Sequence, residues 1–401
     1  MNKTQENNPR FISLDILRGI TLTFMVLVNT PGNSATTYTQ LKHVAWHGWS
    51  IADIVFPTFL WIVGVAMVFS LKRKVEKSLT HSEIIRGVLR RSAILFFLGL
   101  FINGFPDFHW ETWRILGVLQ RIAICYLFGS ILYLNFGLYS RILAIPILLI
   151  GYWLIMMMIP IPHFGAGHLD MAHNLSHFVD YTILGPHNHL YTKTWDPEGF
   201  LGTFPSLATL LLGSFAGELL LNKHIQKKVG LLAGIGLSLI AIGLLWNPWL
   251  PINKNLWTSS FSLFMAGLDF LFLSGLMLIT RYKICQTLCQ PFIILGVNAI
   301  AIYVVSELFE IMLLKSSIHQ RIYDFMSASI HDPYQASLTY SFGYVLLMFV
   351  LAYSLYRKNV SFVVNSNCNN DPDWYFKSDL NRYKIIEKDL GFIQMNGSFY
   401  S

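Results

Sequence analysis

Long apolar stretches joined by short polar segments run through most of the chain. A helix that crosses the hydrocarbon core of a bilayer needs about 20 mainly apolar residues. Ten stretches meet or approach this length, at residues 11–30, 50–71, 91–105, 115–135, 141–161, 199–221, 229–249, 258–280, 291–314 and 335–356. The pattern predicts an all-α, polytopic membrane bundle of about ten transmembrane helices. We expect residues 1–360 to form one domain and residues 361–401 to form a polar tail.

Composition agrees with a membrane protein. The 401 residues are 54% hydrophobic and 13% charged, whereas soluble domains carry about 25% charged residues. The N-terminal segment MNKTQENNPRFISLD has no small-residue cleavage site after an apolar core. We therefore expect no removable signal peptide and a first helix that is retained as an anchor.

The net charge of +7 indicates the membrane topology rather than a class of binding partner. In membrane proteins, Lys and Arg concentrate in cytoplasmic connections. With the basic segment 72–91 placed in the cytoplasm, seventeen Lys and Arg residues fall inside and six outside, the tail left aside. The asymmetry predicts cytoplasmic N- and C-termini and gives no reason to expect a nucleic-acid partner. It also places residues 31–49 and the start of the second helix on the non-cytoplasmic face.

The segment LKHVAWHGWSIADIVFPTFLWIVG, residues 41–64, carries the clearest candidate chemistry. Asp53 lies just inside an apolar stretch, and an ionisable residue at such a boundary is costly enough to suggest a functional site. His43 and His47 precede it and supply the side chain best suited to proton transfer near neutral pH. We therefore expect a catalytic centre here.

Polar residues inside two other stretches are candidate ligands for an anion. Asp15 and Arg18 are three residues apart and share a helix face, which fits either an ion pair or contact with an anionic ligand from the cytoplasm. Gln120 and Arg121 lie in the fourth stretch, and a buried Arg offers a rigid fork to phosphate or carboxylate. The alternative for Arg121 is pairing with a carboxylate of another helix, such as Asp269 or Glu218.

Polar and aromatic residues at the expected outer mouth would suit a sugar. Asp196 and Glu198 stand in TWDPEGFLGTFPS before the sixth stretch, and Asn253 and Lys254 stand in PINKNLW before the eighth. Trp46, between the two histidines, is a further expected contact for the acceptor. Spacing alone leaves open whether these groups converge.

Metal binding is not expected. The long outer connection, residues 162–198, holds six histidines, and His-rich tracts can bind metal. However, no paired metal motif of the HExxH type appears in the chain. Cys285 and Cys289 share a helix face without a His pair at ligand spacing, so a zinc site is not indicated.

Several motifs in order resemble those of the heparan-alpha-glucosaminide N-acetyltransferase family. They are SLDILRGITLTFMVLVN, LKHVAWHGWSIADIVFPTFLWIVG, RILGVLQRIAICY, WDPEGFLGTFPS, PINKNLW and GVNAIAIYVVSELFE. The resemblance implies transfer of an acetyl group from cytoplasmic acetyl-CoA to an amino sugar on the other side of the membrane. It also implies a possible homodimer and, because the chain looks like the compact form, a bacterial inner membrane.

The resemblance also implies roles for individual residues. The active-site histidine of the family corresponds to His43, the asparagine that closes the first conserved helix to Asn29, and the aspartate of the AD pair to Asp53. We place Arg121, with Gln120 and Arg18, near CoA, and we place Asp196 and Glu198 near the acceptor. The run after Asn29 is TPGNS rather than a glycine run, which departs from the family pattern.

Three functions remain open from the sequence. In the acetyltransferase, His43 acts either as a general base or as a carrier of the acetyl group. A second possibility is an acyltransferase of the same fold that acts on another glycan. The third is an ion-coupled transporter of a small polar or sugar-like solute, because intramembrane Arg, Asp and Glu suit a carrier.

Overall fold

The computed structural model describes residues 12–188, 192–222 and 227–358, and these residues form helices joined by connections, with no β-strand among them. The helices of four or more residues are α1 (Ile12–Asn29), α2 (Ile51–Glu76), α3 (His81–Gly104), α4 (Val118–Asn135), α5 (Leu138–Met158), α6 (Leu175–Leu184), α7 (Thr203–Leu221), α8 (Lys228–Trp246), α9 (Ser259–Ile279), α10 (Lys283–Leu288), α11 (Gln290–Val297), α12 (Ala299–Lys315), α13 (Ile318–Ser329) and α14 (Pro333–Arg357). The all-α prediction is confirmed. The predicted tail, 361–401, lies outside the described residues.

Eight of the described helices are long and apolar enough to cross a membrane, and a bent pair makes nine. The pair is α11 and α12, which meet at Asn298 with a bend of 80°. The predicted third span, 91–105, corresponds to the second half of α3, a helix of 24 residues that carries Arg86, Arg90 and Arg91 and is not among the eight. Ten membrane-length elements are therefore reached only when α3 and the bent pair are both counted.

Helix α2 is the most buried of the candidate spans. Its apolar window is 78% buried, whereas that of α8 is 17% buried. Helix α7 packs closely on α2 because glycines face the partner backbone: Gly64 contacts the carbonyl of Leu210, and Gly213 contacts that of Trp61. Small residues at such crossings let membrane helices approach closely. In the outer helices α5, α8 and α14, less than a third of the apolar window is buried.

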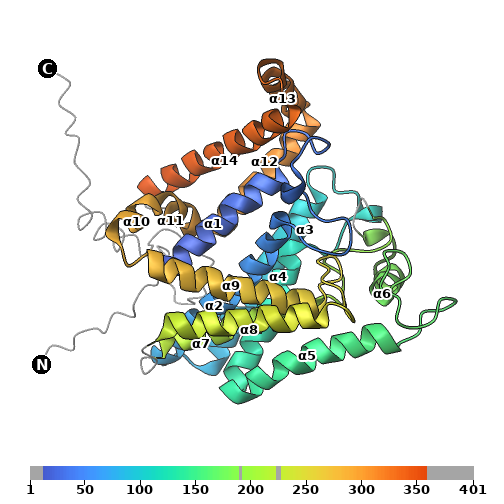
Figure 1. Ribbon diagram of the computed structural model, residues 1–401, viewed down its shortest axis with the longest axis vertical. Helices are drawn as coiled ribbons and strands as arrows, with labels where there is room; N and C mark the ends of the chain where they lie inside the picture. The colour runs from blue at the N-terminus through green and yellow to red at the C-terminus, as the bar shows by residue number, and fades with distance from the viewer. Residues whose placement is uncertain (1–11, 189–191, 223–226, 359–401) are drawn as a thin grey trace, which may run out of the picture.

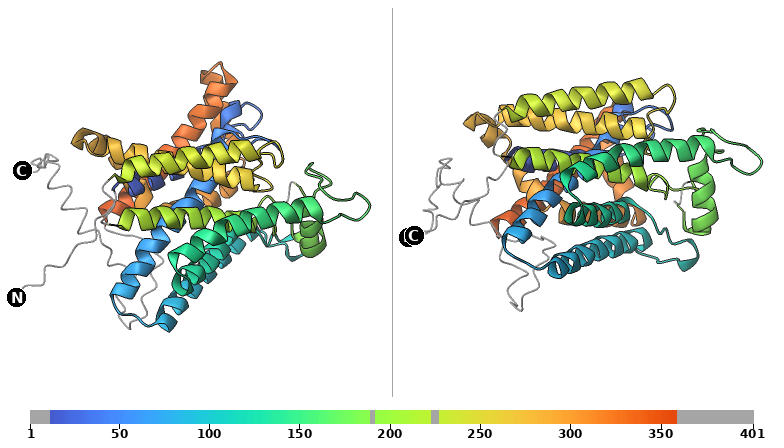
Figure 2. Two further views of the ribbon diagram at one scale, coloured as in Figure 1. Left: turned by 60° about the horizontal axis from the view of Figure 1, so that its bottom comes forward. Right: turned by 90° about the horizontal axis from the view of Figure 1, so that it is seen from below.

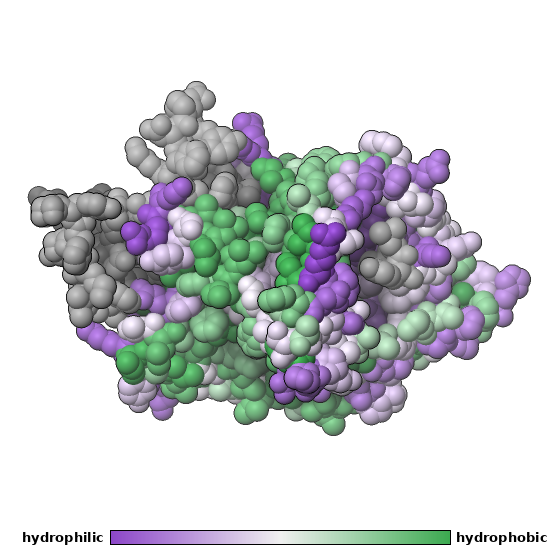
Figure 3. Space-filling view, turned by 90° about the horizontal axis from the view of Figure 1, so that it is seen from above, coloured by the Kyte–Doolittle hydropathy of each residue, from purple (hydrophilic) through white to green (hydrophobic). Residues whose placement is uncertain are grey.

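The long connections gather at one end of the bundle. Figures 1 and 2 show the connection before α2, helix α6 with its flanking segments, and the connection between α8 and α9 at this end. The first and last of these are joined by backbone: the Gly48 N–H donates to the Ile252 carbonyl at 2.8 Å. In the view of Figure 3, apolar residues cover much of the molecule and hydrophilic residues gather toward this end, at the right. The end therefore collects side chains from distant parts of the sequence.

Candidate functional site

Asp53 is fixed by the start of α2. Ser50 is the N-cap residue, and Asp53 occupies the third helical position, so that the two form a capping box. The Asp53 Oδ2 atom accepts from the Ser50 backbone N–H at 3.1 Å and the Ser50 hydroxyl at 3.0 Å. It also accepts from the Val44 N–H at 3.1 Å. The carboxylate, 1% exposed, is thus a rigid acceptor whose second oxygen faces His43.

His43 pairs with that second oxygen. Its Nδ1 lies 2.8 Å from Asp53 Oδ1, and its side chain is 48% exposed. An ionised carboxylate has no proton to donate, so a hydrogen bond between these two atoms takes its hydrogen from Nδ1. In the neutral ring, the other nitrogen, Nε2, then keeps its lone pair. The pair has the arrangement by which a carboxylate orients a histidine base.

Lys254 reaches the same pair from the connection between α8 and α9. Its Nζ lies 3.3 Å from Asp53 Oδ1, 2.9 Å from His43 Nδ1 and 3.4 Å from His43 Nε2. Burial lowers the pKa of Lys254, and the carboxylates of Asp53 and Glu198 oppose that change. The sequence suggested a contact for the acceptor at this position, whereas the structure places the ammonium on the catalytic candidates.

Asn253 and Trp46 hold the surrounding connections together. The fully buried Asn253 has its Nδ2 3.3 Å from His47 Nδ1, and burial lowers the pKa of His47. The Trp46 indole donates to the Leu169 carbonyl at 2.8 Å and meets the ring of Trp195 edge-on. Both residues therefore make internal contacts in the structure.

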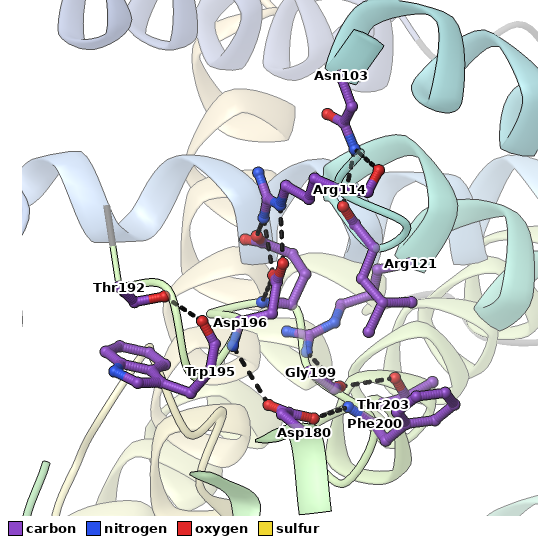
Figure 4. A network of polar contacts seen from close by, with 12 residues as sticks. Asn103, Arg114, Arg121, Asp180, Thr192, Trp195, Asp196, Gly199, Phe200 and Thr203 are labelled. Carbon is purple, nitrogen blue, oxygen red and sulfur yellow. Dashed lines mark hydrogen bonds and ion pairs between the residues drawn. The ribbon is translucent and has the colours of Figure 1, made fainter. Parts of the chain in front are cut away.

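Asp196 and Glu198 are paired with Arg114, which the sequence predicts only as one of the six outer Lys and Arg residues. Arg114 donates through Nε and Nη2 to the two oxygens of Asp196, each at 2.7 Å (Figure 4). Its Nη2 also donates to Glu198. Bidentate pairs of this kind fix both partners. The position of Arg114 at the start of the RILGVLQR motif was the sequence feature that could have indicated this role. Neither carboxylate is an unpaired charge at the mouth.

Arg121 lies beside the same connection. Its Nη2 donates to the Gly199 carbonyl at 2.9 Å, and its guanidinium stacks over the Trp257 ring at 5.1 Å. Among the described residues, its Nε and Nη1 atoms and the Nε2 of the neighbouring Gln120 have no hydrogen-bond partner. Arg121 forms no ion pair with either of the two suggested carboxylates in the part of the chain that the structure describes. Asp269 accepts from the Thr58 hydroxyl at 2.5 Å, and Glu218 pairs with Arg141 at 2.8 Å.

Arg18 and Asn29 lie at different ends of α1. Arg18 forms an ion pair with Asp15 at 3.4 Å. It stands eleven residues before Asn29, or roughly 16 Å along the helix at about 1.5 Å per residue. The Asn29 side-chain amide donates to Glu307 Oε1 of α12 at 2.9 Å. Arg18 and Asn29 are therefore separated by about three turns of α1.

Glu198 links the two polar clusters. It pairs with Arg114, and its carboxylate opposes the lowering of the Lys254 pKa in the His43 cluster. Among the residues that the structure describes, no group of three or more His, Cys, Asp or Glu side chains is arranged to hold a metal ion.

Comparisons with known proteins show which family the chain resembles. A sequence model of the family described as heparan-alpha-glucosaminide N-acetyltransferase, catalytic, matches residues 10–245, more than half of the chain. The human heparan-alpha-glucosaminide N-acetyltransferase is 28% identical over 410 residues, which cover 88% of this chain and 59% of the human protein. The mouse protein is 28% identical over 358 residues, covering 75% of this chain and 54% of its own. The chain thus spans just over half the length of these relatives.

Proposed function

Because this chain belongs to the heparan-alpha-glucosaminide N-acetyltransferase family, we propose that it transfers an acetyl group from acetyl-CoA to the amine of an amino-sugar or glycan acceptor. The observation that carries the proposal is the His43–Asp53 pair: His43 Nδ1 lies 2.8 Å from Asp53 Oδ1, and the imidazole ring is half exposed. The acceptor approaches that exposed side of His43. The donor enters from the cytoplasm and the acceptor from the opposite face, as the distribution of Lys and Arg suggests.

Acetyl transfer to an amine needs a proton acceptor. The amine nitrogen attacks the thioester carbonyl, a C–N bond forms, and the C–S bond breaks as CoA leaves. His43 Nε2 accepts the proton that the nitrogen loses and passes it to the departing sulfur. A base placed in this way accelerates the reaction by about 10²–10⁴-fold. Asp53 supports the step by holding the hydrogen of the ring on Nδ1.

Asn29 and Arg121 are the proposed polar contacts of the donor. The hydrogen bond to Glu307 uses one of the two amide hydrogens of Asn29, and the other can donate to the oxyanion that develops on the thioester. The buried guanidinium of Arg121, with two nitrogens lacking partners among the described residues, suits an anionic or carbonyl oxygen of the donor.

A two-step route uses the same residues. In it, His43 Nε2 attacks the thioester carbonyl, and the C–S bond breaks as CoA leaves as the thiolate. The amine then attacks the acetyl group on the ring, the bond from that carbonyl to Nε2 breaks, and the proton that the amine loses goes to the thiolate. Incubation with radiolabelled acetyl-CoA alone separates the routes, since only the two-step route leaves label on the peptide that contains His43.

The test of the proposed function is acetyl transfer by purified protein in detergent, with labelled acetyl-CoA and a panel of glucosamine-containing acceptors. We expect transfer by the wild type and a loss of about 10²–10⁴-fold in His43→Ala. His173→Ala is the matched control, because His173 forms another His–Asp pair, with Asp170 at 3.0 Å, in the exposed part of the long connection. Full activity of His43→Ala would contradict the proposed role.

One structural feature favours a carrier as the second candidate. Broken helices form the substrate sites of many transporters, and α11 and α12 are bent by 80° at the buried Asn298. Carriers generally repeat such a break in a second half of the molecule, and the described residues contain a single bent pair. Thermal stabilisation of the purified protein by acetyl-CoA supports the acetyltransferase, whereas sugar uptake into proteoliposomes without such stabilisation supports the carrier.

A further inference from the structure

The carboxylate of Asp53 needs a countercharge. It is 1% exposed at the start of a membrane-spanning helix, where an isolated charge is strongly destabilising. In the described part of the chain, its ion partners are His43 at 2.8 Å and Lys254 at 3.3 Å. Each could neutralise the carboxylate, but with different consequences for His43.

If His43 were the countercharge, it would have to be an imidazolium. Both ring nitrogens would then carry hydrogen, and neither could accept a proton or attack a thioester. If an ammonium supplies the positive charge instead, the carboxylate is neutralised and the ring keeps its lone pair on Nε2.

We propose that Lys254 is a positioning residue of the active site, which supplies the countercharge to Asp53 and so leaves His43 unprotonated. The inference rests on the proposed function, because it assigns the unprotonated ring to the chemistry. Lys254 acts through Asp53 and His43 and makes no contact with the substrates in this scheme.

The surroundings of Lys254 suit a fixed charge rather than a mobile surface lysine. Its side chain is 15% exposed. Its backbone carbonyl accepts from the Trp257 N–H at 3.0 Å, and the next residue, Asn255, donates through its side chain to the Ala45 carbonyl at 3.2 Å. The connection that carries Lys254 is thereby tied to the connection that carries His43.

The charged groups that face this cluster come from three directions. Asp53 comes from α2, Lys254 from the connection between α8 and α9, and the negative charge of Glu198 acts on Lys254 from the connection before α7. On the side of His43 itself, Lys42 donates to the Ala35 carbonyl and lies outside the Asp53 pairing. Lys254 is therefore the cation whose removal leaves His43 as the remaining counterion of Asp53.

No sequence pattern around Lys254 indicates this role. It follows His43 by 211 positions and lies beyond residues 10–245, which match the family model. Only the pairing of the two connections at the end of the bundle brings the residues together.

The test is the pH–rate profile of acetyl transfer in Lys254→Met and Lys254→Arg. A nearby positive charge opposes protonation of the ring, so its removal lets His43 take up a proton at higher pH. We expect the acid limb of the profile to move upward by about one pH unit or more in Lys254→Met. Lys254→Arg keeps a permanent charge and should keep the wild-type limb. Lys315→Met is the matched control, because Lys315 pairs with Asp107 elsewhere.

A second measurement does not depend on acetyl transfer. Diethyl pyrocarbonate reacts with unprotonated imidazole, and mass spectrometry of the peptide containing His43 follows its modification as a function of pH. We expect the same upward displacement in Lys254→Met and in Lys254→Gln, which serves if the first variant does not fold. Modification profiles that coincide with the wild type overturn the role of Lys254. A displaced modification profile in a protein without acetyltransferase activity supports the positioning role of Lys254 and refutes the proposed function instead.

Discussion

Asp180 shows how one buried carboxylate orders part of the site. It lies on α6 and is fully buried. Its oxygens accept from the backbone N–H groups of Asp196 at 3.3 Å and Phe200 at 3.0 Å (Figure 4). Asp180 therefore fixes the connection that presents Asp196 and Glu198 to Arg114. Burial raises the pKa of Asp180 from 3.8 to about 7, although the two N–H donors oppose that rise.

The raised pKa of Asp180 gives a prediction with a defined sign. The folded protein binds this proton more tightly than the unfolded chain does, so the stabilisation is present below pH 4 and is lost as pH rises through 7. Asp180→Asn has a similar shape and no charge. We expect its melting temperature in detergent to exceed that of the wild type by a few degrees at pH 8, and the two to converge toward pH 4.

Glu83→Gln is the control for this measurement. Hydrogen bonds from the backbone and the side chain of Thr80 lower the pKa of Glu83, which lies in the first turn of α3. Its contribution is lost only as pH falls below the unfolded value of 4.5, so this variant should show no pH-dependent difference between pH 5 and 8. Parallel melting curves for Asp180→Asn and the wild type would contradict the role of burial.

At the scale of helices, the close crossing of α2 and α7 sets the position of the site. Asp53 begins α2, and the connection with Asp196 and Glu198 leads directly into α7. Glycines on each helix face the backbone of the other, and a Cβ added at Gly64 or Gly213 would overlap a carbonyl oxygen of the partner. The two helices must separate to accept any side chain there.

Gly213→Ala tests this crossing. Overpacking of a tight contact costs about 1–3 kcal/mol, so we expect a lower melting temperature. We also expect reduced acetyl transfer, because separating α2 from α7 moves Asp53 relative to the connection that carries Asp196 and Glu198. Gly275→Ala, in the span α9, is the matched control, because a Cβ there meets nothing within 4 Å. Equal melting temperatures for the two variants would show that the crossing is more tolerant than its geometry indicates.

The helices themselves follow from the sequence for a physical reason. A lipid-exposed backbone has to satisfy its hydrogen bonds within one helix, so a long apolar stretch has few other structures available to it. The break at Asn298 was not predicted because the apolar stretch continues through it. The site could be predicted only in part. His43 and Asp53 lie in one local motif, so their spacing indicated a pair. The contacts of Arg114 with Asp196 and of Lys254 with Asp53 join residues that are far apart in the sequence, and no local pattern relates them.

At the scale of the whole molecule, the candidate site occupies the end of the bundle where the long connections gather (Figure 1). The segment that joins α2 to α3 contains Lys77 and lies 24 residues after Asp53 along the chain. At about 1.5 Å per helical residue, α2 separates the two by more than the 30 Å thickness of a hydrocarbon core. A function that connects two sides of a membrane therefore requires these two ends to face different compartments.

Single-cysteine labelling tests that requirement in intact cells. In a background in which the native cysteines are replaced and acetyl transfer is retained, Lys193→Cys places a thiol in the long connection before α7, and Lys77→Cys places one between α2 and α3; both positions are exposed. We expect a membrane-impermeant maleimide to label the first in intact cells and the second only after permeabilisation. The reverse pattern would put His43 in the cytoplasm with acetyl-CoA. The acceptor would then have to be a cytoplasmic amine, because an acetyl group that stays on one side of the membrane cannot modify a glycan on the other.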